Sequence, residues 1–228
     1  MSGAGRGGHV TVLTFHGIGE PGPDVPADER PYWCPDALWP SLVDEVADLR
    51  ASGVPVEVTF DDGNASDVRH ALPELLRRGL TATFHACAGR TGLPGYLSAV
   101  DLRALREAGM GIGSHGWAHV DLRRAGADEL AREADASRRA LQDASGGPVE
   151  RFAIPFGSYD RRVLRALRGY RTVYTSDAAP ARAGAWLQPR HSYTRGWTTG
   201  TVTALATGAP PAAARVRRSV VTTLKRFR

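Results

Sequence analysis

Residues 55–89 read PVEVTFDDGNASDVRHALPELLRRGLTATFHACAG. The two ends of this stretch, 55–63 and 81–89, are short runs rich in Val, Thr and Phe, a composition typical of strands. Between them, residues 66–80 carry apolar side chains at helical spacing. A strand, a helix and a second strand in this order predict a βαβ unit with two parallel strands.

The same alternation continues along the rest of the chain. We predict further strands at 9–17, 111–116, 151–157 and 171–177, and further helices at 37–53, 97–110, 127–147 and 159–170. About seven strands, with no G-x-G-x-x-G motif opening a helix, favour a distorted or incomplete (β/α) barrel over a dinucleotide-binding sheet. We therefore expect an α/β fold with parallel strands. The Pro- and Asp-rich residues 21–35 are expected to form a long loop over the rim of the barrel.

The composition of the 228 residues, 42% hydrophobic and 23% charged, is that of a globular protein. No window approaches the roughly 18 apolar residues of a membrane span. The N-terminal residues lack the apolar run of a secretory signal. We therefore expect a cytoplasmic protein. Its two cysteines are too few for a disulfide framework.

The positive charge is concentrated at the C-terminus. The net charge is +5, and residues 210–228 hold six basic residues and no acidic one, so residues 1–209 carry about −1. A near-neutral body argues against nucleic-acid binding. We predict one domain over 1–209 and a basic tail or helix over 210–228. The tail is expected to dock on the body, with peripheral contact to a membrane or a protein as the alternative.

Two polar motifs follow predicted strands: Asp61 and Asp62 in TFDDG, and His115 and His119 in SHGWAH. Each has a structural interpretation when taken alone, because Asp-Gly is a favoured turn pair and a single H-x-x-x-H pair is often structural. Together they offer two imidazoles and a carboxylate, which leave positions open for water as catalytic zinc and non-haem iron sites require. The second carboxylate is then available as a general base.

TFDDG, SHGWAH and then FAIPFG (152–157) resemble, in content and order, the motifs of the polysaccharide deacetylase family (NodB homology, carbohydrate esterase family 4). The resemblance covers about residues 10–195. It implies a distorted (β/α) barrel that hydrolyses N-acetyl groups on sugars with a divalent metal, for which we expect zinc. By this resemblance Asp61 is the catalytic base, and the metal ligands are Asp62, His115 and His119.

The third motif matches the P-(Y/F)-G segment of the family at Pro155, Phe156 and Gly157. In relatives a backbone N–H at the position of Phe156 helps to hold the oxyanion. The implied chemistry is attack on the acetyl carbonyl by a water molecule whose pKa the cation lowers, while Asp61 accepts the proton. A general acid must then protonate the leaving amine.

The first departure from the family pattern is Ala153. Many members have an arginine at this position, two residues before the motif proline, where it pairs with the catalytic Asp. Arg151 is the first candidate to replace it. If no other charge is supplied, we expect Asp61 to titrate at a higher pH than in members that contain the arginine.

The second departure concerns the general acid, which the family usually supplies from a histidine on a late strand. The one late histidine here is His191, in WLQPRHSY (186–193). We assign it as the acid by this weak match, with an ordinary loop residue as the alternative.

Two other functions of the protein stay open. One is hydrolysis of a non-sugar amide C–N bond, and the other is a glycan-binding module without turnover.

Overall fold

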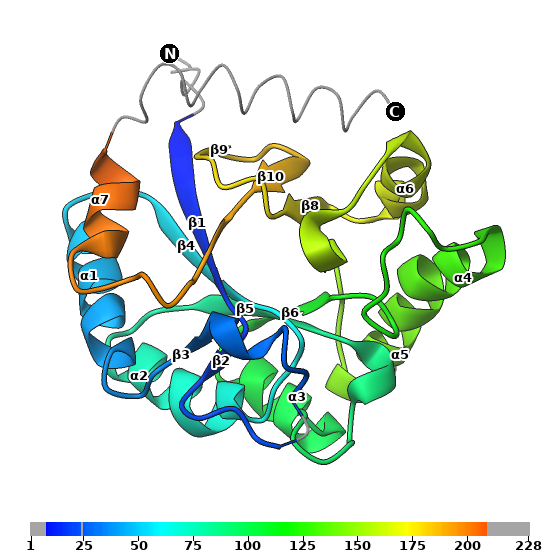
Figure 1. Ribbon diagram of the computed structural model, residues 1–228, viewed down its shortest axis with the longest axis horizontal. Helices are drawn as coiled ribbons and strands as arrows, with labels where there is room; N and C mark the ends of the chain where they lie inside the picture. The colour runs from blue at the N-terminus through cyan, green and yellow to red at the C-terminus, as the bar shows by residue number, and fades with distance from the viewer. Residues whose placement is uncertain (1–7, 24, 209–228) are drawn as a thin grey trace.

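The structure, a computed structural model, describes residues 8–23 and 25–208 (Figure 1). Its main sheet runs in the order β10-β8-β7-β6-β5-β4-β1-β11, and these neighbours pair in parallel. The strands are β1 (His9–Phe15), β4 (Val56–Phe60), β5 (Ala82–Ala86), β6 (Gly111–Ser114), β7 (Arg151–Ala153), β8 (Thr172–Thr175), β10 (Leu187–Pro189) and β11 (His191–Ser192). Short strand β9 (Ala181–Arg182) pairs antiparallel to β1, and β2 (Gly17–Ile18) pairs with β3 (Trp33–Cys34).

One stretch of chain closes the barrel. β10 pairs with β8 at one edge of the sheet, β11 pairs with β1 at the other, and only Arg190 separates these two short strands. If β10 and β11 are counted as one strand, the described residues form a ring of seven parallel strands. The predicted distorted (β/α) barrel is confirmed. The closing strand itself is absent from the strands that the sequence predicted.

The helices lie around the outside of the sheet (Figure 1). They are α1 (Trp39–Ala51), α2 (Leu72–Arg77), α3 (Ala99–Glu107), α4 (Ala127–Ala131), α5 (Ser137–Ser145), α6 (Arg161–Ala166) and α7 (Thr201–Thr207). Two of them are extended by π-helical turns, Asp67–Ala71 before α2 and Arg132–Ala136 between α4 and α5. Single 3-10 turns cover Arg30–Tyr32, Ala88–Arg90, Pro155–Gly157 and Leu167–Gly169.

Local sequence explains where these helices begin and end. Ser98 and Asp101 form a reciprocal capping box at the start of α3, which satisfies backbone N–H groups that the helix leaves unpaired. α5 ends at Gly146, which has φ 72° and so adopts the left-handed conformation that glycine tolerates best. The predicted helices over 37–53, 66–80, 97–110, 127–147 and 159–170 are all present.

Alternation along β1 shows how the two faces of the barrel differ. Leu13 and Phe15 point outward into the main core beneath the helices, whereas Val10 and Val12 belong to a small separate cluster with Ala153, Tyr174 and Ala181. The next inward side chain is Thr14, which contacts the guanidinium of Arg190. Along β1 the barrel interior is therefore apolar at Val10 and Val12 and becomes polar at Thr14, toward the carboxyl end of the strand.

Among the helices that the structure describes, none has the length and apolar character needed to cross a membrane. Residues 210–228 lie outside the described part of the chain. The boundary near residue 209 and the role of the basic tail therefore stay predictions.

Candidate metal and catalytic site

Two loops at the carboxyl ends of strands bring the predicted metal ligands together. Asp61 and Asp62 follow β4, and His115 follows β6. Asp62, His115 and His119 offer ligand atoms that all lie within 4.8 Å of one another. The Oδ1 atom of Asp62 is 3.6 Å from Nε2 of His115 and 3.4 Å from Nε2 of His119. These three predicted ligands thus surround a single point.

The backbone is strained where it carries the site residues. Asp62, His119 and Phe156 have φ values of 75°, 56° and 57°, a left-handed conformation that is uncommon outside glycine. Such strain is typical of functional sites, where the surrounding structure holds it in place. At Asp62 this conformation ends the alternation of side chains along the strand, so the adjacent carboxylates of Asp61 and Asp62 reach the same site.

The three residues fit a divalent cation by their chemistry. Both carboxylate oxygens of Asp62 are buried and have no hydrogen-bond partner among the described residues. Burial raises the pKa of this carboxyl well above its usual value, and the charges of Glu29 and Asp61 raise it further. A cation would satisfy these oxygens and reverse the repulsion.

The two imidazoles also suit a metal, because metal-bound histidines are neutral. Burial holds the pKa of His115 well below its usual value and lowers the pKa of His119 to about 4. The Nδ1 atom of His115 is 2.8 Å from the carbonyl oxygen of Ala153, which accepts a hydrogen bond from the Nδ1–H group and leaves Nε2 directed at Asp62. This arrangement, with the second ring nitrogen held by an acceptor, is characteristic of metal-ligating histidines.

Asp61 is held by a buried arginine. Both amino groups of Arg190 donate to its carboxylate, Nη1 to Oδ1 at 2.8 Å and Nη2 to Oδ2 at 2.6 Å. The Nδ1 atom of His85 lies 3.2 Å from Oδ1. Burial raises the pKa of Asp61, but Arg190, His115 and His85 together outweigh it and hold that pKa well below its usual value. Asp61 is therefore an anion in the buried site.

The expected consequence of Ala153 is corrected by this contact. We expected Asp61 to titrate at a higher pH than in members with the arginine if no other charge is supplied; Arg190 supplies that charge from the β10–β11 junction and holds the pKa of Asp61 low, so the condition is not met. Arg151, the first candidate, instead donates from Nη1 to the hydroxyl of Thr83. In the sequence, Arg190 is marked only as a basic residue just before His191. Its partner lies 129 positions earlier, so only closure of the barrel joins the two.

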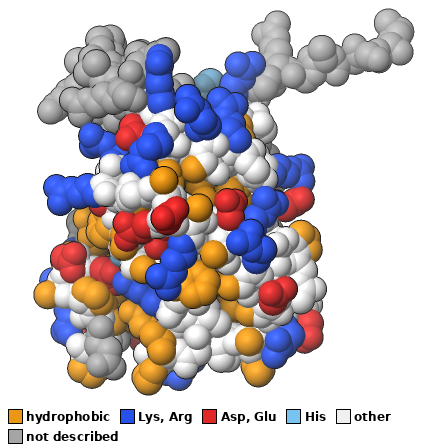
Figure 2. Space-filling view, turned by 90° about the vertical axis from the view of Figure 1, so that its right-hand side faces the viewer, with side chains coloured by type: hydrophobic (Ala, Val, Ile, Leu, Met, Phe, Trp, Pro, Cys, Tyr) orange, Lys and Arg blue, Asp and Glu red, His pale blue; other side chains and the backbone are white. Residues whose placement is uncertain are grey.

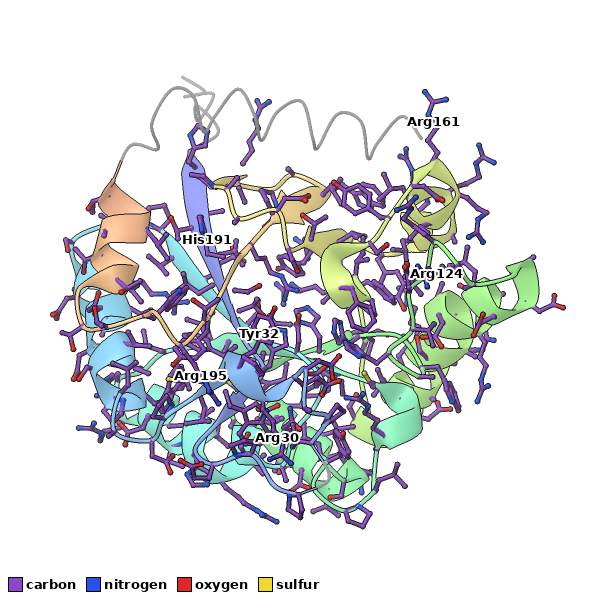
Figure 3. All side chains as sticks on the ribbon, viewed as in Figure 1. Arg30, Tyr32, Arg124, Arg161, His191 and Arg195 are labelled. Carbon is purple, nitrogen blue, oxygen red and sulfur yellow. The ribbon has the colours of Figure 1, made fainter. Side chains whose placement is uncertain are left out.

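Asp61 and the histidines line a pocket of about 260 Å³. Its walls are His16, Asp28, Glu29, Tyr32, Asp61, His115, His119, Ile154, Phe156, Ser176 and Ser192. The loop expected over the rim is present, and it contributes Asp28, Glu29 and Tyr32. Figure 3 shows Tyr32 near the middle of the view, where this loop crosses the barrel.

The remaining predicted site residues are placed as follows. Phe156 lines the pocket, and the neighbouring Pro155 and Gly157 are buried in the turn that shapes it. His191 lies on β11 and pairs with Leu13 of β1. It is not among the pocket-lining residues, whereas its neighbour Ser192 is. Successive strand residues point to opposite sides, which accounts for the difference. The role of His191 as general acid stays a prediction.

Glu133 is a site residue that the sequence analysis missed. It is 1% exposed, and its carboxylate accepts hydrogen bonds from the backbone N–H groups of Trp117 at 2.6 Å and Ala118 at 3.1 Å. It therefore fixes the loop that joins His115 to His119. It lies on the π-helical turn Arg132–Ala136, a type of turn that often occurs at functional sites.

A larger cavity of about 710 Å³ lies elsewhere, beside α6. It is lined by Arg161, Arg165 and Arg168 together with Trp186, and it contains none of the motif residues. Figure 2 shows basic side chains gathered on the upper part of this side of the molecule. Its size does not make it the candidate catalytic site, because Asp61, His115 and His119 line the smaller pocket.

The profile of the family described as "Polysaccharide deacetylase" matches residues 50–174, more than half of the chain. The chain belongs to the polysaccharide deacetylase family. It is 22% identical over 184 residues to the protein YxkH of Bacillus subtilis (strain 168), and this match spans 75% of the chain and 66% of YxkH.

Solved structures of deacetylases share the fold of this family member. A polysaccharide deacetylase from Bacillus cereus, BC0361, superposes with a TM-score of 0.76 at 19% identity, covering 88% of this chain and 69% of that one. The Streptococcus pyogenes deacetylase PplD, solved in complex with acetate, gives a TM-score of 0.74 at 19% identity, covering 90% of this chain and 100% of PplD.

Proposed function

We propose that this family member is a metal-dependent hydrolase that removes the N-acetyl group from an N-acetylated sugar or glycan precursor, with Asp61 as general base. One observation carries the proposal. A carboxylate kept ionised by Arg190 lines the same small pocket as the histidines of a three-ligand site whose aspartate oxygens are otherwise unsatisfied.

The bound cation would be held by Asp62, His115 and His119, and it would supply an acidified water and a polarised acetyl carbonyl. Asp61 would take the proton from that water. Its Oδ2 atom is 4.0 Å from Nε2 of His115, and it is not one of the three residues whose ligand atoms cluster together. Each carboxylate oxygen has two lone pairs, and the bonds from Arg190 leave capacity for that proton.

The size of the pocket supports a small substrate. Its 260 Å³ lies just below the roughly 300–1,000 Å³ usual for drug-sized ligands. Tyr32 and Phe156 present aromatic surface at its walls, and the Phe156 side chain is 59% exposed. We propose that the pocket takes one acetylated sugar unit, either free or at the end of a chain.

The test is acetate release from a panel of compounds, with zinc added. The panel contains N-acetylated monosaccharides, their oligomers and acetylated amines that lack a sugar ring. Release from the sugars that is lost in Asp61→Asn supports the proposal. Release from the sugar-free amines alone would favour the non-sugar amide hydrolase. Retained sugar binding with no turnover of any compound would favour the glycan-binding module.

A further inference from the structure

Glu29 lies against His119 on the side of the ring that faces away from Asp62. Its carboxylate oxygen Oε1 is 3.4 Å from Nδ1 of His119, while Nε2 of the same ring is 3.4 Å from Oδ1 of Asp62. The two ring nitrogens of an imidazole point in different directions. The Nε2 atom of His119 faces the other two predicted ligands, and Glu29 contacts the opposite nitrogen, Nδ1. Glu29 therefore cannot bind the same cation through this contact.

Arg90 fixes the position of this carboxylate. Its Nη2 atom donates to Oε1 of Glu29 at 3.2 Å, and its Nη1 atom is 3.8 Å from Oδ1 of Asp62. The guanidinium also lies over the ring of Tyr96, 5.1 Å from its centroid. Glu29 is 8% exposed, so this ion pair is shielded from water. Arg90 thus contacts Asp62, a predicted metal ligand, and also Glu29, which contacts the predicted ligand His119.

Both histidines have an acceptor oxygen near Nδ1. The Nδ1 of His115 is hydrogen-bonded to the carbonyl oxygen of Ala153 at 2.8 Å, and the Nδ1 of His119 lies 3.4 Å from Oε1 of Glu29 in an ion-pair contact. An acceptor at Nδ1 favours the tautomer that carries its proton there, which leaves the Nε2 lone pair for a metal.

We propose that Glu29 is a positioning residue of the metal site, which sets the tautomer and orientation of His119 through its Nδ1. This inference rests on the proposed function only in taking a divalent cation as the group bound. Glu29 belongs to the loop that also brings Tyr32 to the pocket. We therefore expect the protein to bind the metal tightly when Arg90 holds this loop in place.

The experiment measures zinc affinity by competition with a chelator, in the full chain at neutral pH, for wild type, Glu29→Ala and Glu29→Gln. Loss of such an acceptor weakens metal binding by about 10- to 100-fold, which is the effect expected for Glu29→Ala. Glu29→Gln keeps an acceptor oxygen but loses the charge, so its affinity should lie between the other two. Glu20→Ala is the matched control, because Glu20 is an exposed acid next to the start of this loop and does not line this pocket.

A second readout separates positioning from a merely structural role. Nitrogen NMR of the metal-free protein reports the tautomer of His119, which should carry its proton on Nδ1 in wild type and become mixed in Glu29→Ala. Unchanged zinc affinity and tautomer in Glu29→Ala, with a lower melting temperature alone, would overturn the proposal. If wild type itself binds no zinc, the metal site and the proposed function fail instead. The two failures are therefore distinguishable.

Discussion

Replacing Arg190 with methionine is the sharpest test of the buried ion pair. Arg190 is fully buried, and Asp61 is 2% exposed. Removing one partner of such a pair leaves an uncompensated buried charge, which costs about 3–5 kcal/mol. For a protein of this size each kcal/mol lowers the melting temperature by about 2–4 °C. We therefore expect the metal-free Arg190→Met protein to melt roughly 6–20 °C below wild type at pH 7.

The pH dependence of that deficit identifies its cause. In wild type the folded pKa of Asp61 lies below the unfolded value of about 3.9, so the pair stabilises the fold above that pH and the contribution is lost as pH falls through the folded pKa. In Arg190→Met burial dominates and raises the pKa of Asp61. The folded variant then takes up a proton more readily than its unfolded chain. Its deficit relative to wild type should therefore shrink as pH falls toward 4.

Two control variants complete the measurement, which is thermal unfolding followed by circular dichroism in the presence of a chelator. Arg151→Met removes another barrel arginine, one that bonds a hydroxyl group and not Asp61, and should cost much less. In an Asp61→Asn background Arg190→Met should lose most of its effect, because no buried anion is left unpaired. An equal deficit in that background, or one that grows toward acid pH, would refute the reasoning.

Four further outcomes are expected. Added Zn²⁺ should raise the melting temperature of wild type, and His115→Ala should abolish most of that rise, as differential scanning fluorimetry will show. Asp61→Asn should keep its zinc, measured by elemental analysis, while turnover falls roughly 100-fold or more; loss of the zinc would make Asp61 a ligand. His16 lines the pocket and His191 does not, so kcat in His16→Gln and His191→Gln tests which of them donates the proton to the amine, and an unchanged rate excludes the residue replaced. Ala153→Arg alone should lower the melting temperature, because it places a second cation in the buried apolar cluster, whereas in the Arg190→Met background the same change should recover part of the lost stability.

The sequence predicted those parts of the site that depend on short-range pattern. TFDDG and SHGWAH each lie within one strand–loop segment, so their spacing already places Asp62, His115 and His119 at strand ends. The hydrophobic periods likewise predicted the helices around the barrel. These features need only local alternation and the rule that the carboxyl ends of parallel strands share one face.

The parts that the sequence could not predict depend on tertiary contacts. The closing strand is made of two pieces, Leu187–Pro189 and His191–Ser192, which are too short to show the period of a strand. The first piece also ends in a proline, Pro189. The pairing of Arg190 with Asp61 follows only from closure of the ring. Glu29 contacts the Nδ1 of His119, which is far away in sequence. Glu133 bonds the N–H groups of Trp117 and Ala118 from a different element, 16 and 15 positions along the chain. No motif marks them.

The position of Arg190 has a consequence for the order in which the chain is completed. Asp61 leaves the ribosome 129 residues before its counter-charge, an interval of roughly 6–25 seconds at typical rates of synthesis. During that interval burial of the carboxylate is unfavourable, and the first strands must hold it in water. A chain truncated before residue 190 therefore leaves the barrel interior open. Arg190 is flanked by the two short strands that join the edges of the sheet, so the carboxylate of Asp61 is buried and paired in the same step that completes the fold.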